Sequence, residues 1–333
     1  MLRLPSLAVL LVFVGCLAPE IIPADAGPTA PPFVVEPAPV WDIEGTRIAT
    51  FNGEFLFDGE GDEGAATFPW KGDPAKARAH RAAVGAVIRQ LDADVILVPE
   101  SENLRALELL IAEALPDLGY TPTLVDGRDT FTGQDVGILS RIPIESAGRT
   151  EERASVGVSD ATYGVSKNVW ARLTLAGRPT TLVGVHFLAR PDDRARRDRR
   201  EAQAEVIRRL VARESAAGRE VVVLGDLNDF DESTLDRAGS VPITDVLALI
   251  KEAGPGPDDD LINVLADVPQ SKRFTAFYDR NRNDQFDPGE FSAIDHVLLS
   301  PGLYRQVRDV RFVHTHDPRE VSDHFPIVVT LAD

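Results

Sequence analysis

Polar residues follow an apolar stretch of this chain at the spacing that puts side chains on one face of a strand. Residues 221–228 read Val-Val-Val-Leu-Gly-Asp-Leu-Asn, so Asp226 and Asn228 come directly after a continuous apolar run. Such a run is typical of a strand buried on both faces. Side chains two positions apart point the same way, so both groups are expected at the strand's carboxyl end, where open α/β sheets bind ligands. The alternative is a strand that ends in an Asx turn.

The same arrangement recurs along the chain. Polar residues follow the apolar stretches 48–51, 95–98 and 182–185, and others precede the predicted strands 297–299 and 327–331. The polar side chains at these predicted strand ends are Asn52, Glu54, Glu100, His186, Asp226, Asn228, Asp295, Asp323 and His324.

These residue types indicate a particular chemistry. Carboxylates and amides form a hard-oxygen site suited to Mg²⁺ or Mn²⁺, and two histidines can transfer protons near neutral pH. Zinc is disfavoured because no HExxH spacing is present, and a covalent serine mechanism is disfavoured because no nucleophile elbow is present. The set therefore predicts metal-assisted attack of water on a phosphate ester.

Amphipathic helices alternate with the predicted strands. Apolar residues recur at helical spacing over 84–91, 104–115 and 206–211, and a short helix is expected over 243–250. Each half of the chain thus runs strand, helix, strand. This repetition predicts a pseudo-symmetric pair of packed sheets with helices outside.

The composition limits the classes of partner. The chain has 333 residues and a formal net charge of −18, so its field disfavours tight, sequence-nonspecific binding of nucleic acid. Its one basic cluster, residues 190–200, has two interpretations. It is either a solvated face with ion pairs such as Asp193–Arg197, or a contact for phosphates beside His186.

The N-terminus is typical of an exported protein. A short apolar run precedes Ala24-Asp25-Ala26, which fits a cleavage site, so residues 1–26 are predicted to be a signal peptide. Cys16, the only cysteine, is placed much as in a bacterial lipoprotein signal. We therefore expect export from a bacterial-type cell, either by secretion or as an outer-surface or periplasmic lipoprotein tethered to a membrane through a lipidated Cys16.

The remaining chain is divided by composition. Residues 27–44 are rich in Pro and Ala and are predicted to be an extended linker. Residues 45–333 are predicted to be one catalytic domain, and no protein partner is evident.

Residues 279–290 follow the spacing of a calcium-binding EF-hand loop. Asp284 replaces the glycine usual at the sixth position, and no flanking helices are evident. A polar turn rich in Asx is the alternative. The predicted Ca²⁺ ligands are Asp279, Asn281, Asn283, Gln285, Asp287 and Glu290.

Six short motifs together resemble the endonuclease/exonuclease/phosphatase superfamily, whose members include deoxyribonuclease I, abasic-site endonucleases and neutral sphingomyelinases. In chain order the motifs are ATFNGE, ADVILVPE, VGVHF, GDLND, AIDHVLLS and SDHFPI. The resemblance spans residues 47–331 and implies a four-layer α/β/β/α sandwich, with two packed mixed sheets flanked by helices.

The resemblance also implies roles. Glu100 is the main metal ligand with Asn52 beside it, and Asp323 lies at or next to the metal. Glu54 is a further candidate metal ligand because of its place at the same strand end as Asn52. Asp226 and Asn228 orient the attacking water and the phosphoryl oxygen. His324 is the catalytic histidine, and Asp295 orients it. His186 corresponds to a second histidine found in deoxyribonuclease-like members.

Two positions depart from the family pattern. Pro99 precedes Glu100 where Gln is usual, and the carboxylate that orients the second histidine has no firm counterpart. Gln134 and Asp135 are the two candidates for that role.

The expected function is a divalent-metal-dependent phosphoesterase that cleaves phosphodiester bonds, first of all an exported deoxyribonuclease I-like nuclease. The alternative is a phosphodiesterase or phosphatase acting on lipid headgroups, as sphingomyelinases do, or on small phosphate esters. A binding module is disfavoured by the complete set of site residues. Among the other histidines, His80 is expected to be exposed and His296 structural, while His314 and His316 are expected either at the surface or at the cleft.

Overall fold

The computed structural model describes residues 33–156, 161–254 and 256–333. The predicted signal peptide with Cys16, and the first part of the predicted linker, lie outside these residues. Within the described ranges, no helix combines the length and the apolar character that a membrane crossing requires.

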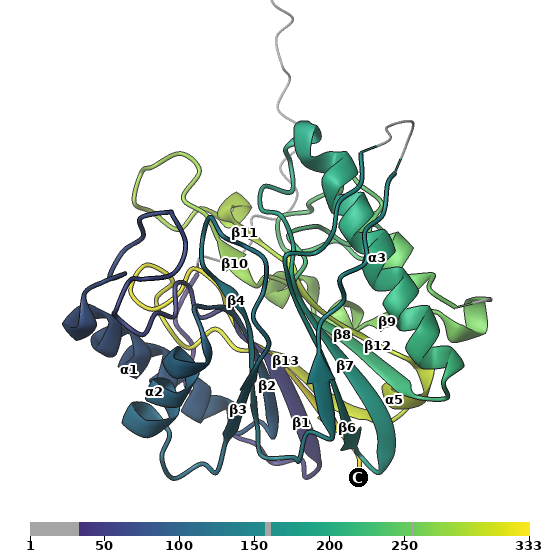
Figure 1. Cartoon of the computed structure of the whole chain (residues 1–333), viewed down its shortest axis with the longest axis horizontal. Helices are drawn as coiled ribbons and strands as arrows, with labels where there is room; N and C mark the ends of the chain where they lie inside the picture. The colour runs from purple at the N-terminus through teal and green to yellow at the C-terminus, as the bar shows by residue number, and fades with distance from the viewer. Residues whose placement is uncertain (1–32, 157–160, 255) are drawn as a thin grey trace, which may run out of the picture. The chain divides into compact units, whose positions relative to one another are not determined.

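Two six-stranded mixed sheets form the centre of the fold (Figure 1). The first has the order β13-β14-β1-β2-β4-β3 and the second β5-β6-β7-β8-β12-β9. The pairs β1–β2 and β7–β8 are parallel, and the other neighbours are antiparallel. The first sheet consists of β1 (Thr46–Thr50), β2 (Val95–Ser101), β3 (Thr121–Leu124), β4 (Asp135–Ser140), β13 (Val307–Phe312) and β14 (Ile327–Leu331). The second consists of β5 (Ser146–Gly148), β6 (Lys167–Leu175), β7 (Arg178–His186), β8 (Glu220–Asp226), β9 (Ile262–Asn263) and β12 (Asp295–Leu299).

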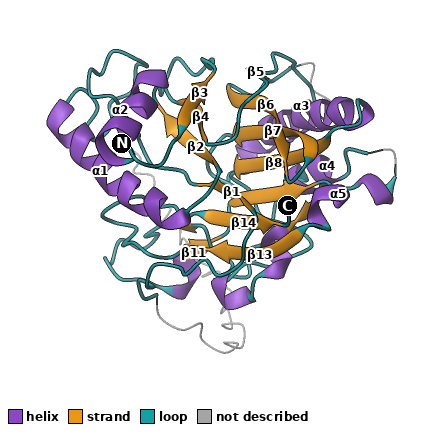
Figure 2. Cartoon of the chain, turned by 90° about the horizontal axis from the view of Figure 1, so that it is seen from below, coloured by secondary structure: helices purple, strands orange, loops and turns teal. Residues whose placement is uncertain are grey.

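Helices cover the outer face of each sheet (Figure 2). The helices α1 (Pro74–Leu91) and α2 (Leu104–Ala114) pack on the first sheet, and α3 (Arg197–Ala216) and α4 (Val246–Lys251) pack on the second. The short helix α5 (Pro301–Tyr304) follows β12, and β10 (Ala276–Phe277) pairs with β11 (Phe291–Ser292) in a small hairpin. The predicted four-layer arrangement is confirmed.

The alternation of side chains along each strand creates the layers. On β2, Val95 and Leu97 lie in the core between the sheets, while Ile96 and Val98 pack toward α1 and α2. Every strand residue from Val95 to Val98 is buried. The apolar runs recognised in the sequence are therefore buried on both faces, as predicted.

The predicted linker differs in part from the structure. Residues 33–44 contain no helix or strand, as expected, but they pack against the domain. Phe33 is buried in an aromatic cluster with Phe274, Phe291 and Phe325, among others. Glu36 N donates to His314 O at 2.8 Å. The apolar Phe33 ring explains the difference, because docking it removes it from water.

Three histidines differ from their predicted exposure. His80 is buried, where Nε2 donates to Gly53 O at 2.8 Å and the ring stacks on Trp70. His314 and His316 are buried as well, and each donates through Nε2 to backbone carbonyls. His296 is structural, as predicted. These rings are buried because each finds a carbonyl partner inside the fold.

Phe33→Ala should lower the free energy of unfolding by about 3 kcal/mol, because it leaves a cavity in the aromatic cluster. Denaturant-induced unfolding measures this change. Val34→Ala is the matched control, since Val34 is 69% exposed and should change little. Equal stability of the two variants would mean that residues 33–44 do not dock in solution.

Candidate active site

Strand register brings three of the predicted residues side by side. Asp226 on β8 pairs with Asp295 on β12 and with His186 on β7. Asp226 lies two residues after Leu224, which packs between the sheets, so its side chain enters the same space at the strand's end. Gly184 keeps the sheets close there, because a Cβ at that position would lie 2.2 Å from Leu97 Cδ1 of the facing sheet.

Glu100 reaches the site through an irregularity in β2. By simple alternation it would follow Val98 toward the helices. Instead, the register with β4 shifts between Pro99 and Ser101, and Glu100 has a left-handed φ of 61°. Such a backbone costs on the order of 1–3 kcal/mol and is concentrated at functional sites. The bulge therefore turns the carboxylate toward the cleft.

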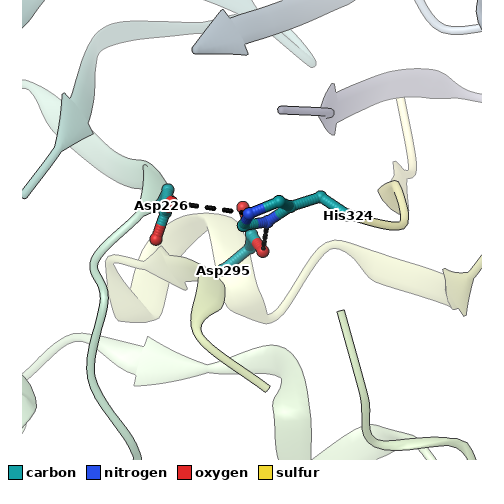
Figure 3. A group of neighbouring side chains, drawn as sticks. All are labelled: Asp226, Asp295 and His324. Carbon is teal, nitrogen blue, oxygen red and sulfur yellow. Dashed lines mark hydrogen bonds and ion pairs between the residues drawn. The ribbon is translucent and has the colours of Figure 1, made fainter. Parts of the chain in front are cut away.

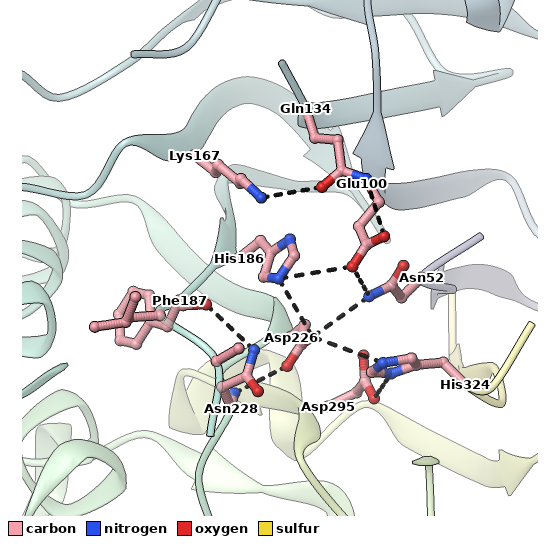
Figure 4. Close-up of polar contacts among 12 residues, drawn as sticks. Asn52, Glu100, Gln134, Lys167, His186, Phe187, Asp226, Asn228, Asp295 and His324 are labelled. Atoms are coloured by element: carbon pink, nitrogen blue, oxygen red, sulfur yellow. Dashed lines mark hydrogen bonds and ion pairs between the residues drawn. The ribbon is translucent and has the colours of Figure 1, made fainter. Parts of the chain in front are cut away.

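Three donors fix the Glu100 carboxylate, and Figure 4 shows two of them, Asn52 and Gln134. Asn52 Nδ2 lies 3.3 Å from Oε1, while Gln134 Nε2 and Phe55 N donate to Oε2 at 3.2 and 3.1 Å. Lys167 Nζ in turn donates to Gln134 Oε1 at 3.2 Å. These contacts tie Glu100 to both sheets.

Sequence reasoning missed Lys167. The residue is buried at the start of β6, directly opposite His186 in the register of the two strands. A usable signal was present, because Lys167 precedes Val169 by two residues and Val169 packs between the sheets. Alternation alone would have directed its ammonium into the cleft.

The shortest contact between a histidine and a carboxylate in the site joins His324 and Asp295 (Figure 3). His324 Nδ1 donates to Asp295 Oδ2 at 2.7 Å, and its Nε2 lies 3.8 Å from Asp226 Oδ2. Burial disfavours the charged ring, but Asp295 and the other nearby carboxylates outweigh it and raise the pKa of His324 well above its usual value. Burial and Asp295 raise the pKa of Asp226 as well. The trio can therefore exchange protons.

His186 has a different environment. Its Nε2 lies 3.6 Å from Asp226 Oδ2 and 3.9 Å from Glu100 Oε1. Burial, reinforced by Lys167, lowers its pKa well below the usual value, so the ring is neutral. Neither predicted partner orients it: Gln134 binds Glu100, and Asp135 accepts from Gly127 N at 2.8 Å. Within the described residues, His186 Nδ1 is buried without a hydrogen-bond partner.

Asn228 is held by its own strand end and by α3. Its N–H donates to Asp226 Oδ1 at 2.9 Å, and Nδ2 donates to Phe187 O at 3.2 Å. The fully buried Arg200 donates to Asn228 O at 2.9 Å. Arg200, a buried member of the basic cluster, thus stabilises the backbone that carries Asn228.

The exposed part of that cluster forms ion pairs, as its first interpretation expects, while a contact with phosphates stays a prediction. Asp193 pairs with Arg196, not with Arg197 as predicted, and Arg197 pairs with Glu201. Arg196 and Arg199 nevertheless line the groove described below.

Oxygen donors of the kind that bind a divalent cation gather beside Asn52. Glu54 Oε2 accepts from Asp323 N at 3.1 Å, and burial together with the Asp323 carboxylate raises the pKa of Glu54 to about 8. Glu100 adds to this effect. These carboxylates repel one another beside the Asn52 amide, and a hard cation bound between them would relieve that repulsion. The donors therefore suit Mg²⁺ or Mn²⁺.

All nine predicted site residues converge in one site. A groove of about 700 Å³ opens beside Glu100 and His186. Cationic and aromatic side chains share its lining, including Arg128, Arg149, Lys167, Phe55, Phe131 and Tyr163. Glu151 neutralises part of this charge, because it pairs with Arg128 and Arg149. The groove is thus of mixed charge rather than a continuous basic track.

The loop 279–290 is separate from this site and connects β10 with β11. Its own side chains close it: Glu290 Oε1 accepts from Arg280 N at 2.9 Å, and Asp279 Oδ2 accepts from Asp284 N at 3.1 Å. Asp284 has a left-handed φ of 59°, the conformation that the sixth position of a calcium loop requires. Calcium binding by this loop stays a prediction.

Comparisons with known proteins agree with this geometry. A family model described as the Endonuclease/Exonuclease/phosphatase family matches residues 49–324. Among curated proteins, the chain is similar to an inositol phosphosphingolipids phospholipase C of Saccharomyces cerevisiae, with 30% identity over 225 residues. This match covers 60% of the chain and 45% of the relative, so the chain spans about half of that relative's length.

Solved structures share the fold. An AP endonuclease from Archaeoglobus fulgidus has a TM-score of 0.58 at 16% identity, covering 86% of this chain and all of that one (100%). A 3′-5′ exonuclease from Neisseria meningitidis has a TM-score of 0.57 at 19% identity, covering 86% and 99%. An endonuclease/exonuclease/phosphatase protein from Bacteroides vulgatus gives 0.57 at 19%, covering 87% and 99%.

Proposed function

The chain belongs to the endonuclease/exonuclease/phosphatase family and is a phosphoesterase, and from this membership we propose that it hydrolyses phosphodiester bonds with the help of a divalent metal ion. The observation that carries the proposal is the convergence of Asp226, His324 and Glu100 from both sheets on one cleft. These are the groups that metal-assisted attack of water on phosphorus requires.

Glu100 and Asn52, with Glu54 and Asp323 at the edge, would hold Mg²⁺ or Mn²⁺. When bound, such an ion stabilises negative charge that develops on phosphoryl oxygens. Asn52 also orients the site, because its amide lies 3.3 Å from Glu100 Oε1 and 3.4 Å from Asp226 Oδ2.

Asp226 orients the attacking water and accepts its proton, since its raised pKa makes it a stronger base than an exposed aspartate. His324 is charged and donates a hydrogen bond to the phosphoryl group, while Asp295 holds its tautomer. One amide hydrogen of Asn228 binds Phe187 O, and the other is available for a phosphoryl oxygen.

Lipid-headgroup phosphodiesters are our first substrate class. The relative of 30% identity is described as a phospholipase C for inositol phosphosphingolipids. Phe131 in the loop between β3 and β4 lines the groove and is 67% exposed, which suits contact with an apolar surface. Nucleic acid is the second class, supported by Arg196 and Arg199 in the same groove. The net charge of −18 disfavours it.

One assay panel tests the substrate. The purified chain is given sphingomyelin and inositol phosphosphingolipid vesicles, plasmid DNA, and bis-p-nitrophenyl phosphate, each with Mg²⁺, with Mn²⁺ and with a chelator. We expect lipid headgroup release that needs the metal. Cleavage of DNA alone would select the nuclease, and metal-independent turnover would contradict the mechanism.

His324→Ala and Asp226→Ala should each lower turnover of the best substrate in this panel by roughly 10²- to 10⁴-fold. Because the site groups act on the reaction, the melting temperature should change by only a few degrees. Glu108→Ala on the exposed face of α2 is the control with full activity. Wild-type rates in either site variant would refute these roles.

We also propose that the loop 279–290 binds Ca²⁺. Glu290 Oε1 and Oε2 lie at the loop's closure, where the twelfth ligand of an EF-hand loop binds the ion. Glu290→Gln should weaken Ca²⁺ binding measured by calorimetry by roughly 10-fold or more. An unchanged affinity would remove this site.

Export with a lipid tether remains our proposal for localisation, supported by the leader sequence. When the full chain is expressed in a bacterium, it should partition into detergent from a membrane fraction, and Cys16→Ala should shift it to the aqueous phase. Equal partitioning of the two proteins would favour simple secretion.

A further inference from the structure

A second group of carboxylates lies away from the Glu100 carboxylate, where the loop of residues 58–63 passes the end of β2. Asp58, Asp62 and Glu102 each bring one carboxylate oxygen within 4.8 Å of the others. Asn103 Nδ2 adjoins them and donates to Asp58 Oδ2 at 3.2 Å and to Glu63 Oε1 at 3.0 Å. The group therefore joins a loop to a strand end.

Glu102 has an oxygen without a partner. The residue is fully buried, and its Oε2 accepts from Asp58 N at 2.8 Å. Its Oε1 is also buried, and no N–H donor among the described residues reaches it, so that only a proton shared with the neighbouring Asp58 carboxyl competes with a bound cation. A buried polar atom left in this state costs on the order of 1–3 kcal/mol, and more when it is charged. The unsatisfied atom points to a missing partner.

Nearby cations do not provide that partner. Across the described ranges, no lysine or arginine forms an ion pair with Asp58, Asp62 or Glu102. Arg81 Nη1 donates only to the carbonyls of Phe57 and Asp58, and its charge is paired with Glu113 at 2.9 Å. Buried charges in proteins are normally paired or bound to metals.

We propose that Asp58, Asp62 and Glu102 bind a structural divalent cation, with Ca²⁺ preferred over Mg²⁺. All the donors are hard oxygens, which both ions accept. Ca²⁺–oxygen distances of about 2.3–2.6 Å suit oxygens that lie several ångströms apart on a loop and a strand end. Mg²⁺ requires a tighter, near-octahedral shell, and a partly solvated loop does not impose one.

The cation site is connected to the active site through the backbone. Leu56 N donates to Glu100 O, and Glu102 N donates to Leu56 O, both at 3.0 Å. The Glu100 carboxylate itself points elsewhere, toward Asn52 and Gln134. A cation at Glu102 would fasten the 58–63 loop to the bulge that carries Glu100. The site does not depend on the proposed reaction.

The test is a count of bound Ca²⁺ by calorimetry on the full-length protein. In the double variant Glu100→Gln/Glu290→Gln, which removes ligands of the two other proposed cation sites, a single Ca²⁺ should still bind and raise the melting temperature. Adding Glu102→Gln should weaken that binding by roughly 10- to 100-fold and abolish the thermal shift. Adding Glu60→Gln, an exposed residue of the same loop, should leave both unchanged.

Two results would overturn the proposal. One is a double variant that binds no Ca²⁺. If Glu102→Gln then raises its melting temperature equally in chelator and in Ca²⁺, Glu102 shares a proton with Asp58 instead of binding a cation. The other is Ca²⁺ binding that survives both Glu102→Gln and Asp62→Asn. Asp62 is exposed, so Asp62→Asn keeps the test available if Glu102→Gln does not fold.

Discussion

The face-to-face packing of the two sheets determines where every group of the active site lies. Each sheet directs alternate side chains into the shared core, and the first polar residue beyond that core enters the cleft. The packing is close enough that Gly184 has no room for a Cβ against Leu97. A larger residue there would separate the two halves of the site, since Glu100 and Asn52 come from one sheet and Asp226 and His186 from the other.

The same packing concentrates negative charge in a place with little water. Asp226 and Asp295 lie opposite each other in strand register, and both are buried. His324 compensates them from one side, while Lys167 approaches Glu100 through Gln134. Burial removes the solvent that would otherwise stabilise these groups, so the arrangement is held by its protein partners. This explains how an acidic chain maintains a site for an anionic substrate.

The sequence predicted the layers and the convergence of the site well, because both follow from periodicity. Apolar runs that end in polar residues at i and i+2 reveal a buried strand and its functional end, as at Asp226 and Asn228. Features that depend on irregular backbone, or on contacts between segments far apart in the chain, could not be predicted from the sequence. The bulge at Glu100 reverses the direction that alternation implies. Phe33 and His314 are buried only because segments far away in the chain meet them.

The docking of Phe33 also limits how far a tethered enzyme could extend. If the chain is anchored at Cys16, the distance from the anchor to the domain is set by the residues before Phe33 rather than by those before residue 45, because residues 33–44 lie along the domain. A segment with that number of residues can span at most about 60 Å, whereas one that ended at residue 44 could span at most about 100 Å. The domain would then be confined to a thin shell above the bilayer, where the local concentration of lipid headgroups is far higher than that of any dissolved phosphate ester.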